Sequence, residues 1–437
     1  MVLPKPRLVG EKTVSGLFTT PENRRILKKV KTRRGYALGT VTIRDVRAIC
    51  TAPAGINLTV VKVETSEPGL YGLGCATFAY RTKAVRCVIE EYLKPLLVGW
   101  DASRIEDLWQ LMNVNAYWRN GPISNNAVSG VDQALWDIKG KMAGMPVYEL
   151  LGGKCREAVP LYLHADGRDF PALSEKIHAY LEAGVRYIRC QIGTYGGGKM
   201  SAATPPGSQP GMYLDPDQYA RATVALFEKL RAEFGFEAEF CHDVHERVQP
   251  VEALRLAKQL EPYRLFFLED LLSPEQGDWY RLLRQQTATP IAVGELFNNP
   301  KEFDFLIANR LIDFIRCHTS QLGGLTPARK LAAFAEVFGV RTAWHGPGDV
   351  SPVGHAANIH LDLATSNLGI QEWTPINETL AEVFPGCPVQ KGGYIYANDR
   401  PGFGIDLDEK LAAKYPCEHP VTQWTQTRLV DGTVIHP

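Results

Sequence analysis

The feature that most restricts the fold is a series of eight short β-rich segments that alternate with helical segments from Val159 onward. From the third segment on, they recur at intervals of about 25 residues, the length of one strand–helix unit. Near-continuous apolar strands alternating with helices are typical of a parallel sheet, and eight units indicate a closed (β/α)8-type barrel. The segments are VPLYLHA, YIRCQIG, EAEFCHDVH, RLFFLED, PIAVGE, IDFIRCH, VRTAWHG and LGIQEW.

The rest of the chain divides around this barrel, because 437 residues exceed the size at which one core stops growing. Residues 41–155 contain alternating strands followed by amphipathic helices, which predicts an α+β domain. The barrel is expected at 156–373. Residues 374–437 are irregular and rich in Pro and Gly, and we expect them to fold back on the first domain. Residues 1–40 are strongly basic and are interpreted as a partly disordered extension, with polyanion binding as the alternative.

Composition excludes several classes of function. The net charge is zero, so no overall field favours nucleic acid or a membrane surface. No run reaches the ~18 apolar residues of a spanning helix, and the first 40 residues lack the apolar core of a signal peptide. Nine cysteines without a C-x-x-C pair are typical of reduced thiols, which predicts a cytoplasmic protein.

Three acidic residues end successive barrel segments at equal intervals of 26 residues, namely Asp243, Glu269 and Glu295. In such barrels the site lies where the strands end. Three converging carboxylates would repel one another and have raised pKa values, which a hard divalent cation such as Mg²⁺ relieves. Cysteine is absent from these ends, which argues against zinc. The alternative is that each acid caps a following helix.

The remaining strand ends also carry polar groups, which are His164, Arg189 with Gln191, His245, Arg316 with His318, His345 and Glu372. A cation surrounded by bases suits the removal of a proton next to a carboxylate, because the cation stabilises the charge that develops. The long Gly/Pro-rich insertion after the second segment is interpreted as an active-site loop.

On these residues the chain resembles the enolase superfamily, specifically the mannonate/gluconate dehydratase-like group, nearer its starvation-sensing, low-activity branch. The resemblance covers about residues 41–437. It includes the three acids and the motifs SGVDQALWDIKGKMAGMPVYELLGG, DVH, ELFNNP, HTSQLGGLT, WHGPGDVSPVGHAAN and QEW.

The resemblance implies an α/β fold in which an α+β capping domain covers a modified (β/α)7β TIM-type barrel. It also implies one Mg²⁺ per subunit, held by the three acids. The implied reaction removes water from a sugar acid, D-gluconate or D-mannonate, and gives 2-keto-3-deoxy-gluconate. The implied protein is a homo-oligomer with a small-molecule sugar acid as its partner.

The resemblance also implies roles for individual residues. His245 is expected to be the general acid that protonates the departing 3-hydroxyl, and Arg189 is expected to orient or activate the base. Where efficient mannonate dehydratases have a tyrosine base this chain has Ser201, so Tyr195 and Tyr213 are the candidates. The residues expected to bind substrate are His164, His245, Arg316, His345, Asp349 and Glu372.

Two other functions stay open. One alternative is a weakly active or inactive family member that acts as a sugar-acid binding or regulatory protein, since the usual tyrosine position holds Ser201. It is alternatively a racemase or epimerase, with His345 as the base on one face and a loop tyrosine on the other. Trp424, near the end of the chain, is a candidate lid residue.

Overall fold

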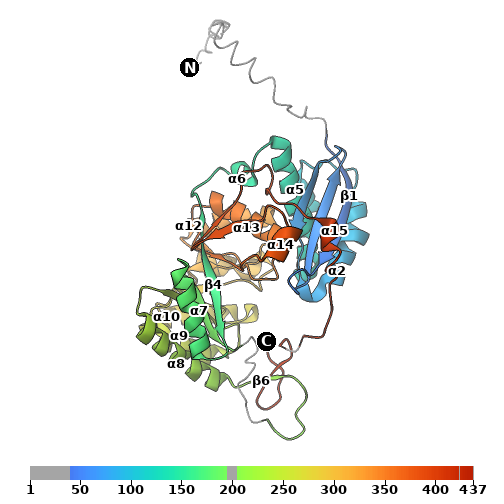
Figure 1. Ribbon diagram of the computed structural model, residues 1–437. Coiled ribbons are helices and arrows are strands. Elements are labelled where there is room, and N and C mark those ends of the chain that lie inside the picture. The colour runs from blue at the N-terminus through green and yellow to red at the C-terminus, as the bar shows by residue number, and fades with distance from the viewer. Residues whose placement is uncertain (1–39, 194–203, 423, 437) are drawn as a thin grey trace, which may run out of the picture. The chain divides into compact units, whose positions relative to one another are not determined.

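The computed structural model describes residues 40–193, 204–422 and 424–436, shown in colour in Figure 1. The predicted basic extension therefore lies outside the described residues, apart from Thr40. Everything below concerns the unit Thr40–Pro437.

The first part of this unit is an antiparallel sheet covered by helices (Figure 1, blue to teal). The strand order is β1-β2-β3. Helix α5 contacts β3 backbone to backbone, because a Cβ on Gly72 or Gly74 would lie 2.0 Å from a carbonyl oxygen of α5. The elements are β1 (Ile43–Thr51), β2 (Leu58–Thr65), β3 (Tyr71–Cys75), α2 (Thr82–Cys87), a π-helical stretch (Val88–Leu93), α3 (Lys94–Leu97), α4 (Ile105–Asn115), α5 (Pro122–Ala143) and α6 (Val147–Leu150).

Eight strands then form a closed parallel barrel, as predicted. Hydrogen-bonded neighbours run in the order β4-β5-β7-β8-β9-β10-β11. A parallel bridge from Thr342 to Leu368 and the pairing of β12 with β4 close the ring. The strands are β4 (Val159–Gly167), β5 (Tyr187–Ile192), β7 (Glu239–Asp243), β8 (Phe267–Glu269), β9 (Ile291–Val293), β10 (Phe314–Ile315), β11 (Arg341–Thr342) and β12 (Gln371–Glu372).

Seven helices connect these strands, so the barrel is of the (β/α)7β type. Several begin at a side chain that accepts a hydrogen bond from the first helical turn, as Asp169, Asp215 and Ser351 do. The helices are α7 (Phe170–Glu182), α8 (Pro216–Phe234), α9 (Pro250–Leu260), α10 (Tyr280–Gln286), α11 (Asp304–Ala308), α12 (Leu325–Val337) and α13 (Pro352–Ala364). Within the described ranges, no helix has the length and apolarity needed to cross a membrane.

The barrel has an apolar interior of its own, separate from the larger core between strands and helices. One side chain from each of seven strands or strand ends fills it: Tyr162, Cys241, Phe267, Ala292, Phe314, Ala343 and Ile370. This layer closes the lower part of the barrel and supports the side chains above it.

The C-terminal segment contacts both the first sheet and the barrel. Thr51 Oγ1 donates to the Ala412 carbonyl at 2.8 Å, and the Tyr71 hydroxyl donates to Asp406 at 2.7 Å. Strand β14 extends β4 in antiparallel fashion, and β15 pairs with β6 of the insertion. The pairing with β4 was not expected, and the boundaries at 155 and 373 stay predictions. The elements are β6 (Met212–Leu214), α14 (Glu378–Val383), β13 (Val389–Lys391), β14 (Tyr394–Tyr396), α15 (Glu409–Ala412) and β15 (Thr427–Leu429).

Candidate active site and metal centre

The candidate site lies at the carboxyl-terminal ends of the barrel strands, one layer above the apolar interior. In extended chain, side chains two positions apart point to the same face. Each interior residue is therefore followed, two positions later, by a residue that faces the mouth of the barrel. This second layer consists of His164, Asp243, Glu269, Gly294, Arg316, His345 and Glu372. All but the glycine were predicted as site residues, and the shared layer explains their convergence.

Two of the predicted metal ligands lie side by side. Asp243 and Glu269 are partners in the register of β7 and β8, and their exposed fractions are 1% and 0%. One oxygen of each lies within 4.8 Å of the other and of an Asp270 oxygen. Burial raises the pKa of Glu269 well above its usual value, against the opposing charge of Arg316. Asp270 was missed from the sequence, although the consecutive acids of RLFFLED were the signal for it.

These carboxylates fit a divalent cation. Asp243 Oδ1 and Asp270 Oδ2 are buried and accept no hydrogen bond from the described residues, and Glu269 Oε1 accepts none either, although it lies 3.0 Å from Arg316 Nη2. Buried polar atoms without a hydrogen-bond partner are rare, and Mg²⁺ prefers hard oxygen ligands. A second group joins His318, His345 and Asp349, but its two imidazoles suit a softer ion than Mg²⁺.

Glu295 does not join the other two predicted ligands in this arrangement. It follows Gly294, whose φ of 141° favours glycine. One Glu295 oxygen lies 2.8 Å from Arg316 Nη1 and 3.1 Å from His345 Nδ1. Burial favours the protonated acid, but the charges of His345 and Arg316 outweigh it and hold the pKa of Glu295 well below its usual range. The structure thus brings together two of the three predicted acids.

Two buried arginines balance the negative charge. Arg316 is 0% exposed, and its Nη2 lies 3.0 Å from Glu269 Oε1 and also bonds Glu372. Arg189 Nη1 lies 3.1 Å from Asp243 Oδ2. Buried charges are tolerated only when they are paired, so each arginine stabilises the acids that converge on the same layer.

His164 and Glu372 form a second buried contact at the barrel mouth. His164 Nε2 lies 2.6 Å from Glu372 Oε1, and the Gly346 amide donates to Glu372 at 2.9 Å. Burial and the Arg189 charge lower the pKa of His164. Burial opposes ionisation of Glu372, but the charge of Arg316 outweighs it and keeps its pKa well below the usual range. Both residues lie where substrate contact was predicted.

His345 is held as a cation by its neighbours. Its Nε2 lies 3.7 Å from Asp349 Oδ1, and its ring contacts the His318 ring at 5.1 Å between centroids. Burial favours neutral imidazole, but the charge of Glu295 outweighs it, so the pKa of His345 lies well above its usual value. Burial and the charge of His345 lower the pKa of His318 to about 3. The structure therefore pairs a charged imidazole with a neutral one.

His245 lies beyond the end of its strand. Strand β7 ends at Asp243, and His245 has a left-handed φ of 54°. A turn rather than strand alternation therefore directs this side chain. His245 Nε2 lies 3.7 Å from Glu295 Oε1, and its ring lies 5.9 Å from that of Trp424. Trp424 in turn contacts Tyr80 at 5.7 Å.

The tyrosines proposed as base are only partly described. Tyr195 and Ser201 lie outside the described residues. Tyr213 lies on β6, where its hydroxyl donates to the Gln209 carbonyl at 2.6 Å. Because the Tyr213 hydroxyl is bonded within its own loop, Tyr195 stays the predicted base.

Comparisons with known proteins agree with this fold. Residues 40–152 match the family described as mandelate racemase / muconate lactonizing enzyme, N-terminal domain, and residues 172–411 match the enolase C-terminal domain-like family. The chain belongs to the enolase superfamily. The predicted superfamily and the predicted fold, a (β/α)7β barrel with an α+β capping domain, are both confirmed.

Within this superfamily, the chain is similar to proteins that are named as D-galactonate dehydratase family members. A D-galactonate dehydratase family member from Musicola paradisiaca is 57% identical over 417 residues, which cover 92% of this chain and 100% of the relative. Another from Salmonella enteritidis has the same identity and coverage. A solved enolase from Pantoea ananatis, with bound D-gluconate and Mg, is 55% identical and superimposes with a TM-score of 0.89, over 91% of this chain and 100% of that one.

Proposed function

We propose that this protein is a Mg²⁺-dependent dehydratase of sugar acids. The observation that carries the proposal is the buried pair Asp243 and Glu269, which are register partners at a barrel mouth that also holds two arginines and two histidines, Arg189, Arg316, His164 and His345. The dehydratase names of the relatives and the D-gluconate and Mg in the Pantoea enolase support the same reaction class.

Asp243, Glu269 and Glu295 are the residues that would hold the metal. Bound Mg²⁺ supplies positive charge that stabilises the substrate carboxylate as the neighbouring proton leaves. To complete the ligand set, Glu295 would have to turn away from Arg316 and His345. Arg316 would keep its contacts to Glu269 and Glu372 and would add positive charge beside an anionic substrate.

Two proton transfers complete the reaction. A base removes the proton from C2, and the electron pair forms a C2–C3 double bond as the 3-hydroxyl departs. His245 gives a proton to that hydroxyl, so that water leaves, and the resulting enol tautomerises to the 2-keto-3-deoxy acid. His245 suits this role because it stands beside Glu295 on the mouth of the barrel. Tyr195, oriented with the help of Arg189, is the proposed base.

The proposed substrate is D-gluconate, because the Pantoea enolase binds it and the notable sequence identity extends over nearly the whole of both chains. D-mannonate, which the motifs suggested, and D-galactonate, which the names of the relatives contain, are the two comparison substrates. His164, His345, Asp349 and Glu372 surround the site and would contact the sugar hydroxyls.

Turnover of these three acids tests the proposal. The protein is treated with EDTA, and formation of the 2-keto-3-deoxy acid is followed with and without added Mg²⁺. We expect product from at least one acid with Mg²⁺ and none without it. In His245→Asn, dehydration is expected to fall by about 10²–10⁴-fold, while exchange of the C2 hydrogen with deuterium continues. His178→Asn changes an exposed histidine paired with Glu233 and serves as the matched control.

The same assay separates the two alternatives. A sugar acid that binds in calorimetry without turnover, in protein shown to bind Mg²⁺, would favour the binding or regulatory role. Deuterium exchange at C2 without loss of water in the unmodified protein would favour the epimerase. The pairing of Glu295 with Arg316 is compatible with either alternative, since it describes the metal-free arrangement.

A further inference from the structure

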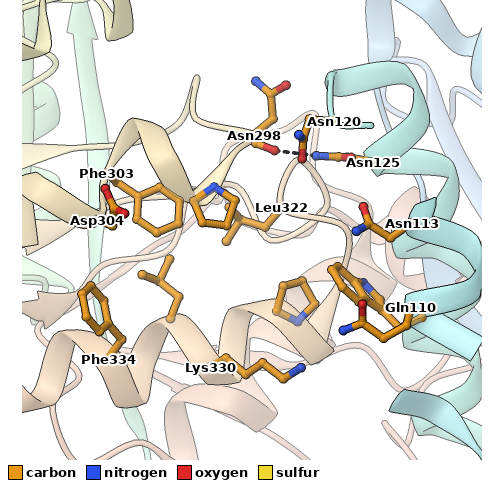
Figure 2. Close-up of a pocket in the computed structure, with 14 residues that line it drawn as sticks. Gln110, Asn113, Asn120, Asn125, Asn298, Phe303, Asp304, Leu322, Lys330 and Phe334 are labelled. Atoms are coloured by element: carbon orange, nitrogen blue, oxygen red, sulfur yellow. Dashed lines mark hydrogen bonds between the residues drawn. The ribbon is translucent and has the colours of Figure 1, made fainter. Parts of the chain in front are cut away.

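A pocket of about 440 Å³ lies between the capping domain and the barrel, and none of the site residues lines it. Two charged side chains line this pocket, Asp304 and Lys330, and Figure 2 shows both. Asp304 already pairs with Lys301, and Lys330 already pairs with Glu106. Since both charges are satisfied, the pocket does not identify a ligand. The C-terminal end of the chain makes more specific contacts, and these lie at the barrel mouth.

Residues 424–436 form a hairpin, called the C-terminal hairpin below. Its two arms are joined by an antiparallel bridge between Arg428 and Val434 and by a hydrogen bond from the Ile435 amide to the Thr427 carbonyl at 3.0 Å. Strand β15 of the hairpin pairs with β6 of the insertion, and Figure 1 shows the C-terminal end of the chain beside β6. The hairpin is therefore fixed to the segment that follows β5.

The C-terminal hairpin contacts two consecutive residues beyond the end of β7. The Trp424 ring lies 5.9 Å from the His245 ring. At the other end of the hairpin, His436 Nδ1 lies 3.0 Å from Glu246 Oε2. Both ends of the hairpin thus meet the turn that carries the proposed general acid.

This turn is strained at two successive residues. His245 and Glu246 have left-handed φ angles of 54° and 55°. Residues other than glycine rarely adopt this conformation, and they keep it only where the surrounding structure holds them. The Glu246 amide donates to the Asp270 carbonyl at 2.8 Å, and the Glu246 side chain adds a second attachment, to His436. The turn is therefore held from the barrel and from the C-terminal hairpin.

The contact between Glu246 and His436 tolerates either arrangement of its proton. The Glu246 side chain is 10% exposed, and burial together with the charge of Glu295 raises the pKa of Glu246 to about 8. The carboxyl group and the neighbouring imidazole can share one proton, so a hydrogen bond joins them whichever group carries it. The attachment therefore does not depend on a full ion pair.

We propose that Glu246 and His436 are positioning residues, through which the C-terminal hairpin holds His245 in place to protonate the departing 3-hydroxyl. This inference rests on the proposed function, in which His245 is the general acid. Such an acid must lie within hydrogen-bond reach of the oxygen that it protonates, and a displacement of about 1 Å can lower a rate by about 100-fold. Without the attachment to His436, the strained turn would relax and carry the imidazole away from that oxygen.

The rates of two steps test this inference. In His436→Ala, we expect kcat for dehydration to fall by about 10- to 100-fold with little change in KM, while exchange of the C2 hydrogen with deuterium continues. His436→Asn keeps a nitrogen donor near the position of Nδ1 and should recover most of the dehydration rate. His419→Ala removes an exposed histidine of the C-terminal segment and should leave both rates unchanged. A contact that merely fastens the end of the chain would instead lower both rates equally or neither.

A double variant tests whether His436 acts through Glu246. Residues that act as one unit have effects that do not add. Glu246→Ala combined with His436→Ala should therefore lower the dehydration rate no further than Glu246→Ala alone. A double variant whose loss equals the product of the two single losses would overturn the proposal, because the two residues would then act independently.

Hydrogen exchange of backbone amides, followed by mass spectrometry, tests the attachment without turnover. The Glu246 amide is bonded to the Asp270 carbonyl, so its exchange reports whether the turn keeps its shape. The peptide that contains Glu246 should exchange faster in His436→Ala than in the unmodified protein, and His419→Ala should leave its exchange unchanged.

The two sets of measurements fail in different ways. Unchanged amide exchange in His436→Ala would overturn the proposal, and so would an equal fall of dehydration and C2 exchange. If the unmodified protein dehydrates none of the three sugar acids, the proposed function fails. Amide exchange in His436→Ala then decides by itself whether His436 holds the turn.

Discussion

Arg316→Met is expected to destabilise the metal-free protein strongly. Arg316 is 0% exposed and lies within ion-pair distance of three carboxylates, the buried ones of Glu269 and Glu372 and the partly buried one of Glu295. Methionine keeps most of the volume but leaves these charges without their main partner. Breaking a buried ion pair in this way costs about 3–5 kcal/mol.

The free energy converts to a melting temperature through the unfolding entropy. About 400 residues at roughly 2.1 cal/mol/K each give about 0.8 kcal/mol/K for the unit Thr40–Pro437. The melting temperature of Arg316→Met in EDTA should therefore fall by about 4–6 °C. Added Mg²⁺ should restore part of the loss, because it brings positive charge back to the same carboxylates.

Thermal melts with two control variants test whether Arg316 balances these carboxylate charges. Arg316→Lys keeps the positive charge but loses the guanidinium group that bonds several acids at once. Its melting temperature should therefore lie between those of the unmodified protein and Arg316→Met. Arg255→Met removes an exposed partner of Glu252 and should shift the temperature by less than about 1 °C. If Arg316→Met melts within about 1 °C of the unmodified protein in EDTA, Arg316 does not balance these charges and the reasoning fails.

Two further predictions concern the metal and the contact between domains. Mg²⁺ at about 100 times its dissociation constant should add about 2.7 kcal/mol to the free energy of unfolding, which raises the melting temperature by about 3 °C. Asp243→Asn should lose most of this gain. If the gain is unchanged in Asp243→Asn, the ion binds elsewhere. Asp132 is buried on α5 and accepts a hydrogen bond from the Thr326 amide at 2.9 Å in the first turn of α12, so Asp132→Ala should cost about 2 kcal/mol. The melting temperature of Asp132→Ala should fall by about 2–3 °C. A fall no larger than that of Asn377→Ala, which removes an exposed helix cap, would show that this contact contributes no more than an exposed cap.

The barrel could be predicted because each strand repeats one local pattern. An interior apolar residue is followed two positions later by a polar residue, as Phe267 is by Glu269 and Phe314 by Arg316. Strand spacing then brings these polar residues to one mouth of the barrel. His164, His345 and Glu372 were selected from the sequence because they are polar residues at the ends of such segments.

Asp270 could not be predicted from strand alternation, because it follows the end of β8 and has a φ of 39°. His245, which was predicted as a site residue, also lies beyond its strand in a left-handed turn, so its orientation could not be predicted. The pairing of β15 with β6 joins segments of three residues each, too short for any periodic pattern. The contact of Trp424 with His245 depends on this return of the chain and was expected only as a general possibility.

The position of Glu295 links the metal to the acid–base groups. In the described arrangement its carboxylate is shared by Arg316 and His345, and this contact is the main reason that His345 is charged. An ion held by Asp243, Glu269 and Glu295 together requires Glu295 to leave both partners. His345 would then lose the neighbour that stabilises its proton, and Arg316 would lose one of its three acids. Without that neighbour the pKa of His345 should fall, so that its imidazole could accept a proton, while Arg316 would keep its contacts to Glu269 and Glu372.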